Sequence, residues 1–378
     1  MSYKIPFNRI HTTGKEKEYI SKAIDLNQIS GNGIYTKKCT TFFNRRYGFK
    51  HSLLTTSCTD ALEMSAILIN IKPGDEVIMP SFTFVSTANA FILRGAKIIF
   101  CDSKAETPGI DEDLIEGLIT KRTKAIVAVH YAGIACNMQK LKSICDRYKI
   151  FLIEDAAQAI DSYYSVDGKP IPLGSFGDLA TFSFHETKNI ICGEGGLLVV
   201  NNENLINRSE IIWEKGTNRS AFFRGEIDKY GWVDLGSSFL PSELNSAFLY
   251  AQIENLDNIQ NKRKLIWEKY FNELQDWCLK YSIGLPHIPN YATNNAHMFY
   301  LICKSNSQRE KIITGLKRNQ IQSVFHYQSL HKSVFFESLH DGRTLSNSDR
   351  FSNCLLRLPL FYNLNVIEVI DKMKSITL

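Results

Sequence analysis

Short runs of β-branched and apolar residues alternate with longer amphipathic stretches between about residues 52 and 200. The runs that read as strands are 76–80, 96–100, 124–129 and 150–153, and the patterns that read as helices include 60–69 and 138–147. Parallel neighbouring strands need a long crossover connection, which is usually a helix. This alternation therefore predicts an α/β fold with a mainly parallel central sheet.

The pattern changes at about residue 245, where apolar residues recur at helical spacing until about residue 275. We expect a long helix here that connects two domains. The first is a large domain, residues 1–250, and the second is a smaller C-terminal α+β domain, residues 251–378. A chain of 378 residues is long enough for this division and for a substantial core.

Charge and cysteine usage narrow the class of protein. The net charge of +5 is mild for this length and no dense block of Lys and Arg occurs, which favours a small anionic ligand over nucleic acid. The nine cysteines are scattered and form no C-x-x-C pair, which favours a reducing compartment over a disulfide framework or a zinc knuckle. No apolar run approaches the roughly 18 residues of a membrane span, and no signal-peptide core opens the chain. We expect a cytosolic protein that binds neither nucleic acid nor membrane.

Lys188 stands between the aromatic segment 182–184 and a glycine cluster at 193–196, and Asp155 ends the apolar run that begins at 150. A lysine can hold an aldehyde as a Schiff base, and a carboxylate can keep a pyridine nitrogen protonated so that the ring accepts electrons. Pyridoxal phosphate chemistry needs both groups. Each residue alone has an ordinary interpretation, a solvated lysine and a helix cap. Together, in this order, they favour pyridoxal phosphate.

A phosphate site is one interpretation of residues 55–60, which lie at the start of the predicted helix 60–69. Free N–H groups and the helix dipole favour an anion there. The other interpretation is a cap, because Asp60 and Glu63 form a pair like a capping box. Both can hold at once, because a cap does not use every N–H group. Ser183 and the nearby glycines can add to the same site.

Two further segments follow predicted strands at the carboxyl edge, where open α/β sheets bind ligands. Phe82 or Phe84 is placed to stack on a pyridine ring, although a phenylalanine after a strand is more often part of the core. His130 also ends a strand, and a hydrogen-bonded structural role is its ordinary interpretation.

The chain resembles the sugar-nucleotide aminotransferases of the DegT/DnrJ/EryC1/StrS family over essentially its whole length. Collinear blocks carry the resemblance: 74–81, 87–91, 183–189, 214–220, 222–225, 228–230, 295–300 and 325–327. It implies the fold of the fold-type I pyridoxal phosphate-dependent aminotransferases and a homodimer, with the block 217–239 as interface material. Within the family the chain is most similar to members that make dTDP-4-amino-4,6-dideoxygalactose for enterobacterial common antigen.

The resemblance also implies roles for the residues that match the family's motifs. Lys188 corresponds to the lysine that binds the cofactor covalently, and Asp155 to the partner of the pyridinium nitrogen. Gln158 corresponds to the residue beside the phenolic oxygen, and Phe84 to the ring that stacks on the cofactor. The residues that fall where the family binds the cofactor phosphate are Cys58, Thr59 and Ser183.

For the substrate, the resemblance leaves His185 as a pocket candidate. Candidates for the nucleotide sugar, whose pyrophosphate favours cationic donors, are Arg219, Arg224, Lys229 and Tyr230. For each of these a surface charge or surface side chain is an equal alternative. Two positions depart from the family. Cys58 stands where most members have glycine, and Ser238 lies in the segment where many members carry an asparagine and an arginine that reach across the dimer to the phosphate.

The reaction that the resemblance implies moves an amino group from L-glutamate to C4 of a dTDP-4-keto-6-deoxyhexose. Amination that gives the gluco epimer, or that acts on a 3-keto sugar nucleotide, remains an alternative because the same groups serve all three. Family members that are dehydratases replace the lysine with histidine, so Lys188 disfavours that activity. A nicotinamide-dependent oxidoreductase is disfavoured because no G-x-G-x-x-G follows a strand. A binding protein without activity would need neither Lys188 nor Asp155.

Overall fold

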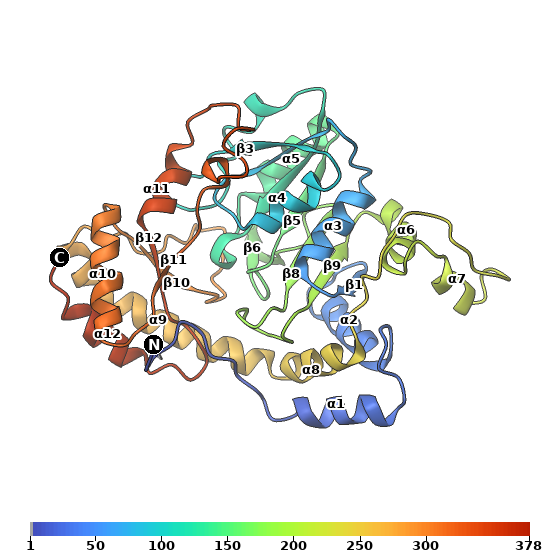
Figure 1. Cartoon of the computed structure of the whole chain (residues 1–378), viewed down its shortest axis with the longest axis horizontal. Helices are drawn as coiled ribbons and strands as arrows, with labels where there is room; N and C mark the ends of the chain where they lie inside the picture. The colour runs from blue at the N-terminus through green and yellow to red at the C-terminus, as the bar shows by residue number, and fades with distance from the viewer. Residues whose placement is uncertain (1–2) are drawn as a thin grey trace.

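A seven-stranded sheet forms the centre of the molecule, which is described by a computed structural model for residues 3–378 (Figure 1). Its strands are β1 (Ser52–Thr55), β2 (Glu76–Pro80), β3 (Lys97–Cys101), β4 (Thr123–Val129), β5 (Phe151–Asp155), β8 (Leu179–Ser183) and β9 (Gly196–Val200). Their order is β1-β9-β8-β5-β4-β2-β3. All neighbours from β8 to β3 are parallel, and β9 is antiparallel to both β8 and β1. The mainly parallel sheet predicted from the alternating pattern is therefore confirmed.

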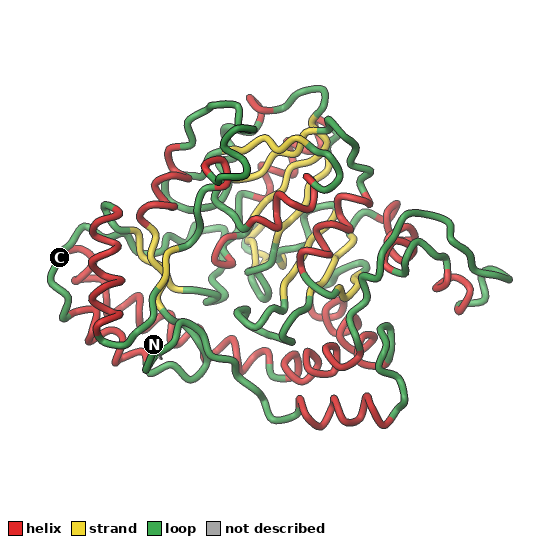
Figure 2. Tube along the Cα trace, in the orientation of Figure 1, coloured by secondary structure: helices red, strands yellow, loops and turns green. Residues whose placement is uncertain are grey.

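Helices cover both faces of this sheet (Figure 2). The helices of this part of the chain are α1 (Glu16–Asp25), α2 (Ile34–Tyr47), α3 (Cys58–Leu68), α4 (Val85–Ile92), α5 (Met138–Tyr148), α6 (Glu203–Trp213), α7 (Arg219–Phe223) and α8 (Glu243–Glu254), of which α7 lies apart from the sheet. Successive residues of β4 face opposite sides, so Ile126 packs in one core cluster and Val127 in the other. Because helices cover both faces, every residue of β2, β8 and β9 is buried, as is usual for the central strands of a sheet that lies between two layers of helices.

A second, smaller sheet lies in the C-terminal part of the chain. Its strands β10 (Phe299–Ile302), β12 (Leu355–Leu358) and β11 (Val324–Phe325) pair antiparallel in that order. The helices around it are α9 (Leu256–Lys280), α10 (Asn306–Arg318), α11 (Ser346–Cys354) and α12 (Val366–Lys374). A separate hairpin consists of β6 (Tyr163–Val166) and β7 (Lys169–Pro172). Short 3₁₀ turns lie at Glu116–Leu118, Tyr131–Gly133 and Leu330–Lys332.

The helix expected over about 245–275 is two helices, α8 and α9, which are separated at Asn255. The Asn255 side chain donates a hydrogen bond to the carbonyl of Ala251 at 3.3 Å, and such local bonds compete with a continuous helix. Helix α9 links the two sheets, because Ile259 packs in the core of the large sheet and Ile266 in the core of the small one. A domain boundary near residue 250 stays a prediction.

The segment 217–239, which we call the arm, extends away from both sheets and carries α7 (Figure 1). Phe223, Tyr230 and Trp232 on the arm are exposed although they are large and apolar or aromatic. In the part of the chain that the structure describes, no helix combines the length and apolar character that crossing a bilayer requires.

The buried Glu154 side chain connects β4, β5 and the loop that precedes β8. Its buried carboxylate accepts hydrogen bonds from the N–H groups of Gly174 (2.8 Å), Phe176 (2.8 Å) and Gly177 (2.7 Å), and it lies 2.9 Å from Nε2 of His130. These contacts fix the loop that enters β8 against the end of β4. His130 is therefore buried and hydrogen-bonded, as its ordinary interpretation predicts, and it also lines the cavity described below.

We expect Glu154→Ala to lower the free energy of unfolding by about 3 kcal/mol, because it leaves three N–H groups, two of them buried, without an acceptor. The exposed Glu268→Ala is the matched control and should change this free energy by less than about 0.5 kcal/mol. Urea unfolding followed by circular dichroism measures both. Equal effects of the two substitutions would show that the Glu154 contacts do not stabilise the fold.

Candidate active site

A cavity of about 440 Å³ opens at the carboxyl ends of β2, β5 and β8. Parallel strands bring their carboxyl ends to one edge of a sheet, which is where open α/β sheets bind ligands. The structure brings many of the predicted site residues into the lining of this one cavity: Cys58, Thr59, Phe84, Asp155, Gln158, Ser183, His185 and Lys188.

Lys188 lies in the turn that follows β8, and its side chain lines the cavity. The turn is held by hydrogen bonds from the N–H of Phe184 to the carbonyl of Gly195 (2.8 Å) and from the N–H of Glu186 to that of Gly193 (3.0 Å). Burial lowers the pKa of the Lys188 amine, although Cys58 and Asp155 act in the opposite direction. A lowered pKa leaves more of the amine neutral near pH 7, and the neutral amine is the nucleophile.

Asp155 is buried at the end of β5, and both of its carboxylate oxygens are anchored. Oδ2 accepts a hydrogen bond from the hydroxyl of Thr87 at 2.7 Å, and Oδ1 accepts one from the N–H of Ala157 at 3.2 Å. The Thr87 hydroxyl lies 2.9 Å from that of Thr83. This network holds a carboxylate at the cavity wall, where it can pair with a cationic ring nitrogen.

The start of α3 provides an anion site. Ser57 is the N-cap, and its hydroxyl oxygen accepts a hydrogen bond from the N–H of Asp60 at 3.1 Å, so the cap is Ser57 with Asp60 and not the predicted pair of Asp60 with Glu63. The N–H groups of Cys58 and Thr59 have no hydrogen-bond partner within residues 3–378. The hydroxyl of Thr59 lies 2.8 Å from that of Ser86, which also lines the cavity. Free N–H groups and hydroxyls at a helix start suit a phosphate.

Gly196 and Cys58 are both compatible with a phosphate at the start of α3. A Cβ atom on Gly196 would lie 2.5 Å from the backbone nitrogen of Cys58, so β9 can pass this close to α3 only with glycine at that position. Burial raises the pKa of the Cys58 thiol, which therefore stays neutral and places no negative charge beside the phosphate. The departure from glycine at residue 58 is thus compatible with anion binding.

Phe84 and Gln158 line the same cavity as Lys188, Asp155 and the start of α3. Phe82 is fully buried and belongs to the core, whereas Phe84 is 53% exposed at the cavity, so the stacking interpretation applies to Phe84. The Oε1 of Gln158 accepts a hydrogen bond from the N–H of Ala132 at 2.6 Å, and its Nε2 donates to the hydroxyl of Tyr327 at 3.2 Å. The amide orientation is therefore fixed by the protein.

His185 lies at the edge of the cavity. Its Nδ1 is 2.9 Å from the hydroxyl of Thr187, and its Nε2 is 3.6 Å from a carboxylate oxygen of Glu194. The candidate residue is thus held in the pocket between a hydroxyl and a carboxylate. It stays a predicted substrate contact.

Several lining residues were missed by reasoning from the sequence: Phe7, Ser86, Thr87, His297, His326, Tyr327 and Arg357. Most of them come from the N-terminal segment and the small sheet, far from Lys188 in the chain. Only the collinear blocks 295–300 and 325–327 carried a signal for His297, His326 and Tyr327. No strand-end or helix-start pattern pointed to Arg357.

The predicted residues on the arm do not line the cavity of their own chain. They are Arg219, Arg224, Lys229, Tyr230 and Ser238. The Arg224 guanidinium pairs with Glu210 at 2.8 Å and with Glu226 at 2.7 Å, and that of Arg219 lies 5.0 Å from the centre of the Phe223 ring. Their roles toward substrate or cofactor stay predictions.

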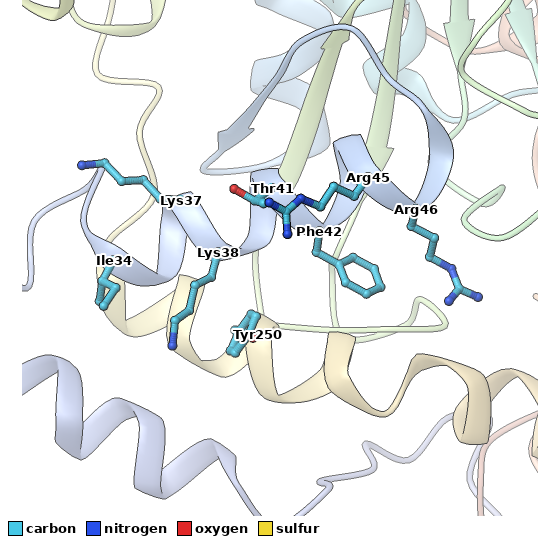
Figure 3. Close-up of a pocket in the computed structure, with 8 residues that line it drawn as sticks. All are labelled: Ile34, Lys37, Lys38, Thr41, Phe42, Arg45, Arg46 and Tyr250. Atoms are coloured by element: carbon cyan, nitrogen blue, oxygen red, sulfur yellow. The ribbon is translucent and has the colours of Figure 1, made fainter. Parts of the chain in front are cut away.

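A larger surface hollow of about 630 Å³ lies between α2 and α8 (Figure 3). Four cationic side chains line it: Lys37, Lys38, Arg45 and Arg46. The Lys38 amine lies 5.0 Å from the centre of the Tyr250 ring. Its lining contains no carboxylate that could pair with a cationic ring nitrogen, so it lacks one of the two groups that pyridoxal phosphate chemistry needs. The cavity around Lys188 is the candidate active site.

The functional groups that line this cavity match those that pyridoxal phosphate requires. The Lys188 amine can hold its aldehyde, the anchored Asp155 carboxylate suits its ring nitrogen, and the free N–H groups at the start of α3 suit its phosphate. Phe84 supplies an exposed ring beside them.

We expect labelling of Lys188 to begin at a lower pH than that of an ordinary lysine with a pKa near 10.5. Acetic anhydride reacts only with the neutral amine, so a lowered pKa moves the rise in labelling to lower pH. Mass spectrometry of the cofactor-free protein, labelled across a pH series, measures this. Because the Asp155 carboxylate raises the pKa, Asp155→Asn should move the rise lower still. The urea-unfolded protein is the control, and identical profiles for folded and unfolded protein would contradict the expectation.

The comparisons with known proteins agree with this geometry. The sequence profile of the DegT/DnrJ/EryC1/StrS aminotransferase family matches residues 11–376. GDP-perosamine synthase of Vibrio cholerae is 31% identical over 362 residues, which cover 94% of this chain and 93% of that protein. The structure of NtdA from Bacillus subtilis, with the cofactor PMP bound, aligns with a TM-score of 0.85 at 26% identity over 97% of this chain and 82% of that one. DesV of S. venezuelae aligns with a TM-score of 0.87 at 25% identity over 99% and 98%.

PMP is the aminated form of pyridoxal phosphate, so these relatives confirm the predicted cofactor as well as the predicted fold class. The match covers both sheets and the arm, and it extends from the N-terminal segment to α12. The chain belongs to the DegT/DnrJ/EryC1/StrS aminotransferase family.

Proposed function

We propose that the protein is a cytosolic enzyme that moves an amino group from L-glutamate to C4 of dTDP-4-keto-6-deoxy-D-glucose. The products are dTDP-4-amino-4,6-dideoxy-D-galactose and 2-oxoglutarate. The observation that carries the proposal is the meeting of the Lys188 amine and the anchored Asp155 carboxylate in one cavity. The choice of sugar is supported by the sequence blocks that resemble family members of this specificity, such as 183–189 and 295–300. The free state of all cysteines within residues 3–378 supports a reducing location.

Lys188 is the group that moves the proton. When bound, pyridoxal phosphate supplies an aldehyde that takes up an amino group and a ring that accepts an electron pair. In the first half of the reaction Lys188 would take the proton from the α-carbon of the donor and pass it to the cofactor, and in the second half it would take a proton back from the cofactor and deliver it to C4 of the sugar. The burial that lowers the pKa of its amine favours the neutral form that acts as a base. Asp155 keeps the ring nitrogen protonated during both halves.

The seating of the sugar decides the product. Lys188 approaches from one wall of the cavity, so the proton reaches one face of the sugar carbon. If the sugar is seated so that a proton from the Lys188 side leaves the new amine axial, the product has the galacto configuration. The opposite seating gives an equatorial amine and the gluco epimer. A GDP-linked keto sugar is a second candidate acceptor, because a relative at 31% identity is named GDP-perosamine synthase.

We further propose a homodimer in which the arm of one protomer reaches the cavity of its partner. Large side chains on the arm are exposed in the single chain: Trp232 by 83%, Phe223 by 68% and Val233 by 55%. Exposed apolar groups gathered on one segment are typical of an interface. In such a dimer the arm residues Arg219 and Lys229 would be available to the pyrophosphate of the partner's substrate.

The product identifies the reaction. We expect purified protein with L-glutamate and dTDP-4-keto-6-deoxyglucose to give an amino sugar with a small coupling between H3 and H4 in proton NMR, because the amine is axial. A large coupling would establish the gluco epimer. Lys188→Ala should form no product, whereas Lys169→Ala, an exposed lysine on the β6–β7 hairpin, should act as wild type. Turnover only with a 3-keto or a GDP-linked sugar would overturn the proposed substrate.

The dimer is tested by molar mass in solution. We expect light scattering to give twice the chain mass of 43.1 kDa for the wild type and a shift toward the monomer for Trp232→Asp, because a charge at the centre of an apolar interface is costly. Val334→Asp is the matched control, since Val334 is 92% exposed and lies outside the arm. A wild-type protein that stays monomeric at micromolar concentration would contradict the proposal.

A further inference from the structure

Arg357 is a half-buried cation whose Nε atom is fully buried, and the proposed chemistry gives it no role. It lies on β12 of the small sheet, and its side chain lines the same cavity as Lys188. Its guanidinium lies 4.7 Å from the centre of the Phe7 ring, so an aromatic face covers it on one side. Burial lowers the pKa of the Arg357 guanidinium, but the ordinary pKa of arginine is so high that the group stays charged near pH 7. The cavity wall opposite the large sheet therefore carries a positive charge near pH 7.

The contacts of Arg357 leave that charge without a counter-ion. Nη1 lies 3.1 Å from Nε2 of His326, and the Nε of Arg357 is buried without a hydrogen-bond partner. No Asp or Glu carboxylate in residues 3–378 forms an ion pair with it. A buried guanidinium normally pairs with an anion, because an unpaired charge inside a protein is strongly unfavourable.

His326 does not supply the missing charge. Its Nδ1 lies 2.9 Å from the hydroxyl of Tyr131, and its Nε2 faces the Arg357 guanidinium, so Nε2 accepts and Nδ1 carries the proton. Burial and the nearby Arg357 lower the pKa of His326 well below its usual range, which keeps the imidazole neutral. His326 therefore orients the guanidinium and leaves donor N–H groups of Arg357 for a ligand.

The anion must come from a substrate and not from the cofactor phosphate. The free N–H groups at the start of α3 and the hydroxyls of Thr59 and Ser86 already form a phosphate site on the large sheet. Arg357 belongs to the small sheet, and its charge acts on Lys188, whose pKa it helps to lower. An α-amino acid such as the proposed donor glutamate carries a carboxylate whose carbon is two bonds from the amine nitrogen, so this anion enters the cavity with the amine that replaces Lys188.

We infer that Arg357 binds the α-carboxylate of the amino donor through its guanidinium fork, with His326 and Tyr131 as the residues that position it. A planar guanidinium matches a carboxylate through two parallel hydrogen bonds. The inference rests on the proposed function, since it specifies how that site takes its donor. It restricts the donor to α-amino carboxylates and excludes simple amines of similar size.

The two halves of the reaction separate this role from a structural one. Arg357→Gln should weaken the half-reaction of the holoenzyme with L-glutamate about 100-fold, read as the glutamate concentration at half-maximal rate in single-turnover absorbance. In the second half-reaction, the aminated enzyme reacts with the keto sugar nucleotide. The sugar concentration at half-maximal rate should there stay within a few-fold of wild type. Arg357→Lys should recover part of the loss, because it restores the charge without the fork. Arg318→Gln, an exposed arginine on α10, is the matched control.

A binding measurement gives a readout that does not depend on turnover. Calorimetric titration of the holoenzyme in its aldehyde form with 2-oxoglutarate, a pair that has no amino group to transfer, should show a similar loss of affinity in Arg357→Gln and none in Arg318→Gln. A loss confined to the half-reaction with the sugar would assign Arg357 to the pyrophosphate and overturn the inference. Equal loss in both halves would show a structural role and overturn it as well.

The same data distinguish a failure of the inference from a failure of the proposed function. If the wild type converts glutamate to 2-oxoglutarate in a manner that depends on Arg357, but aminates no dTDP-linked 4-keto sugar, the proposed acceptor is wrong and the role of Arg357 stands. If amination of that sugar proceeds and Arg357→Gln uses glutamate as the wild type does, the proposed acceptor stands and the role inferred for Arg357 is wrong.

Discussion

The parallel pairing of β5 with β8 is the contact on which the active site depends. It aligns the ends of two strands so that Asp155 and Ser183 arrive at one edge, and the turn after β8 then places Lys188 in the same cavity. The buried Glu154 carboxylate secures this register from behind by binding the loop that enters β8. The chemistry at the edge therefore relies on a network one residue away from Asp155 that touches no substrate.

Local patterns in the sequence indicated Asp155, Lys188 and the start of α3 in this half of the site, whereas Gln158 was predicted only from the resemblance to the family. Asp155 ends a buried strand and Lys188 follows another, so the period of the strands and the direction of the sheet predict that the two side chains meet. The start of α3 was equally readable, because helix starts present free N–H groups whatever surrounds them. Even here the details needed packing: the cap is Ser57, and Phe84 rather than Phe82 faces the cavity.

The other half of the site could not be read in this way. Arg357 sits in a short strand whose neighbours are all apolar, and nothing local distinguishes it from a surface arginine at an edge. It becomes informative only because tertiary structure places its guanidinium beside His326, with Nε buried and no carboxylate paired to it. The break of the expected long helix at Asn255 was also hidden, because the apolar spacing continues across it. The arm residues do not line the cavity of their own chain, and no local pattern in the sequence places them at a site.

The division of the cavity between two sheets has a consequence for how such proteins diversify. Lys188 and Asp155 are fixed by the large sheet, whereas His326, Tyr327 and Arg357 come from the region of the small one, and α9 joins the two cores. Substitutions along α9 would tilt one wall against the other and change the width of the space between them. A lineage can in this way exchange one carbohydrate for another while its reaction stays the same.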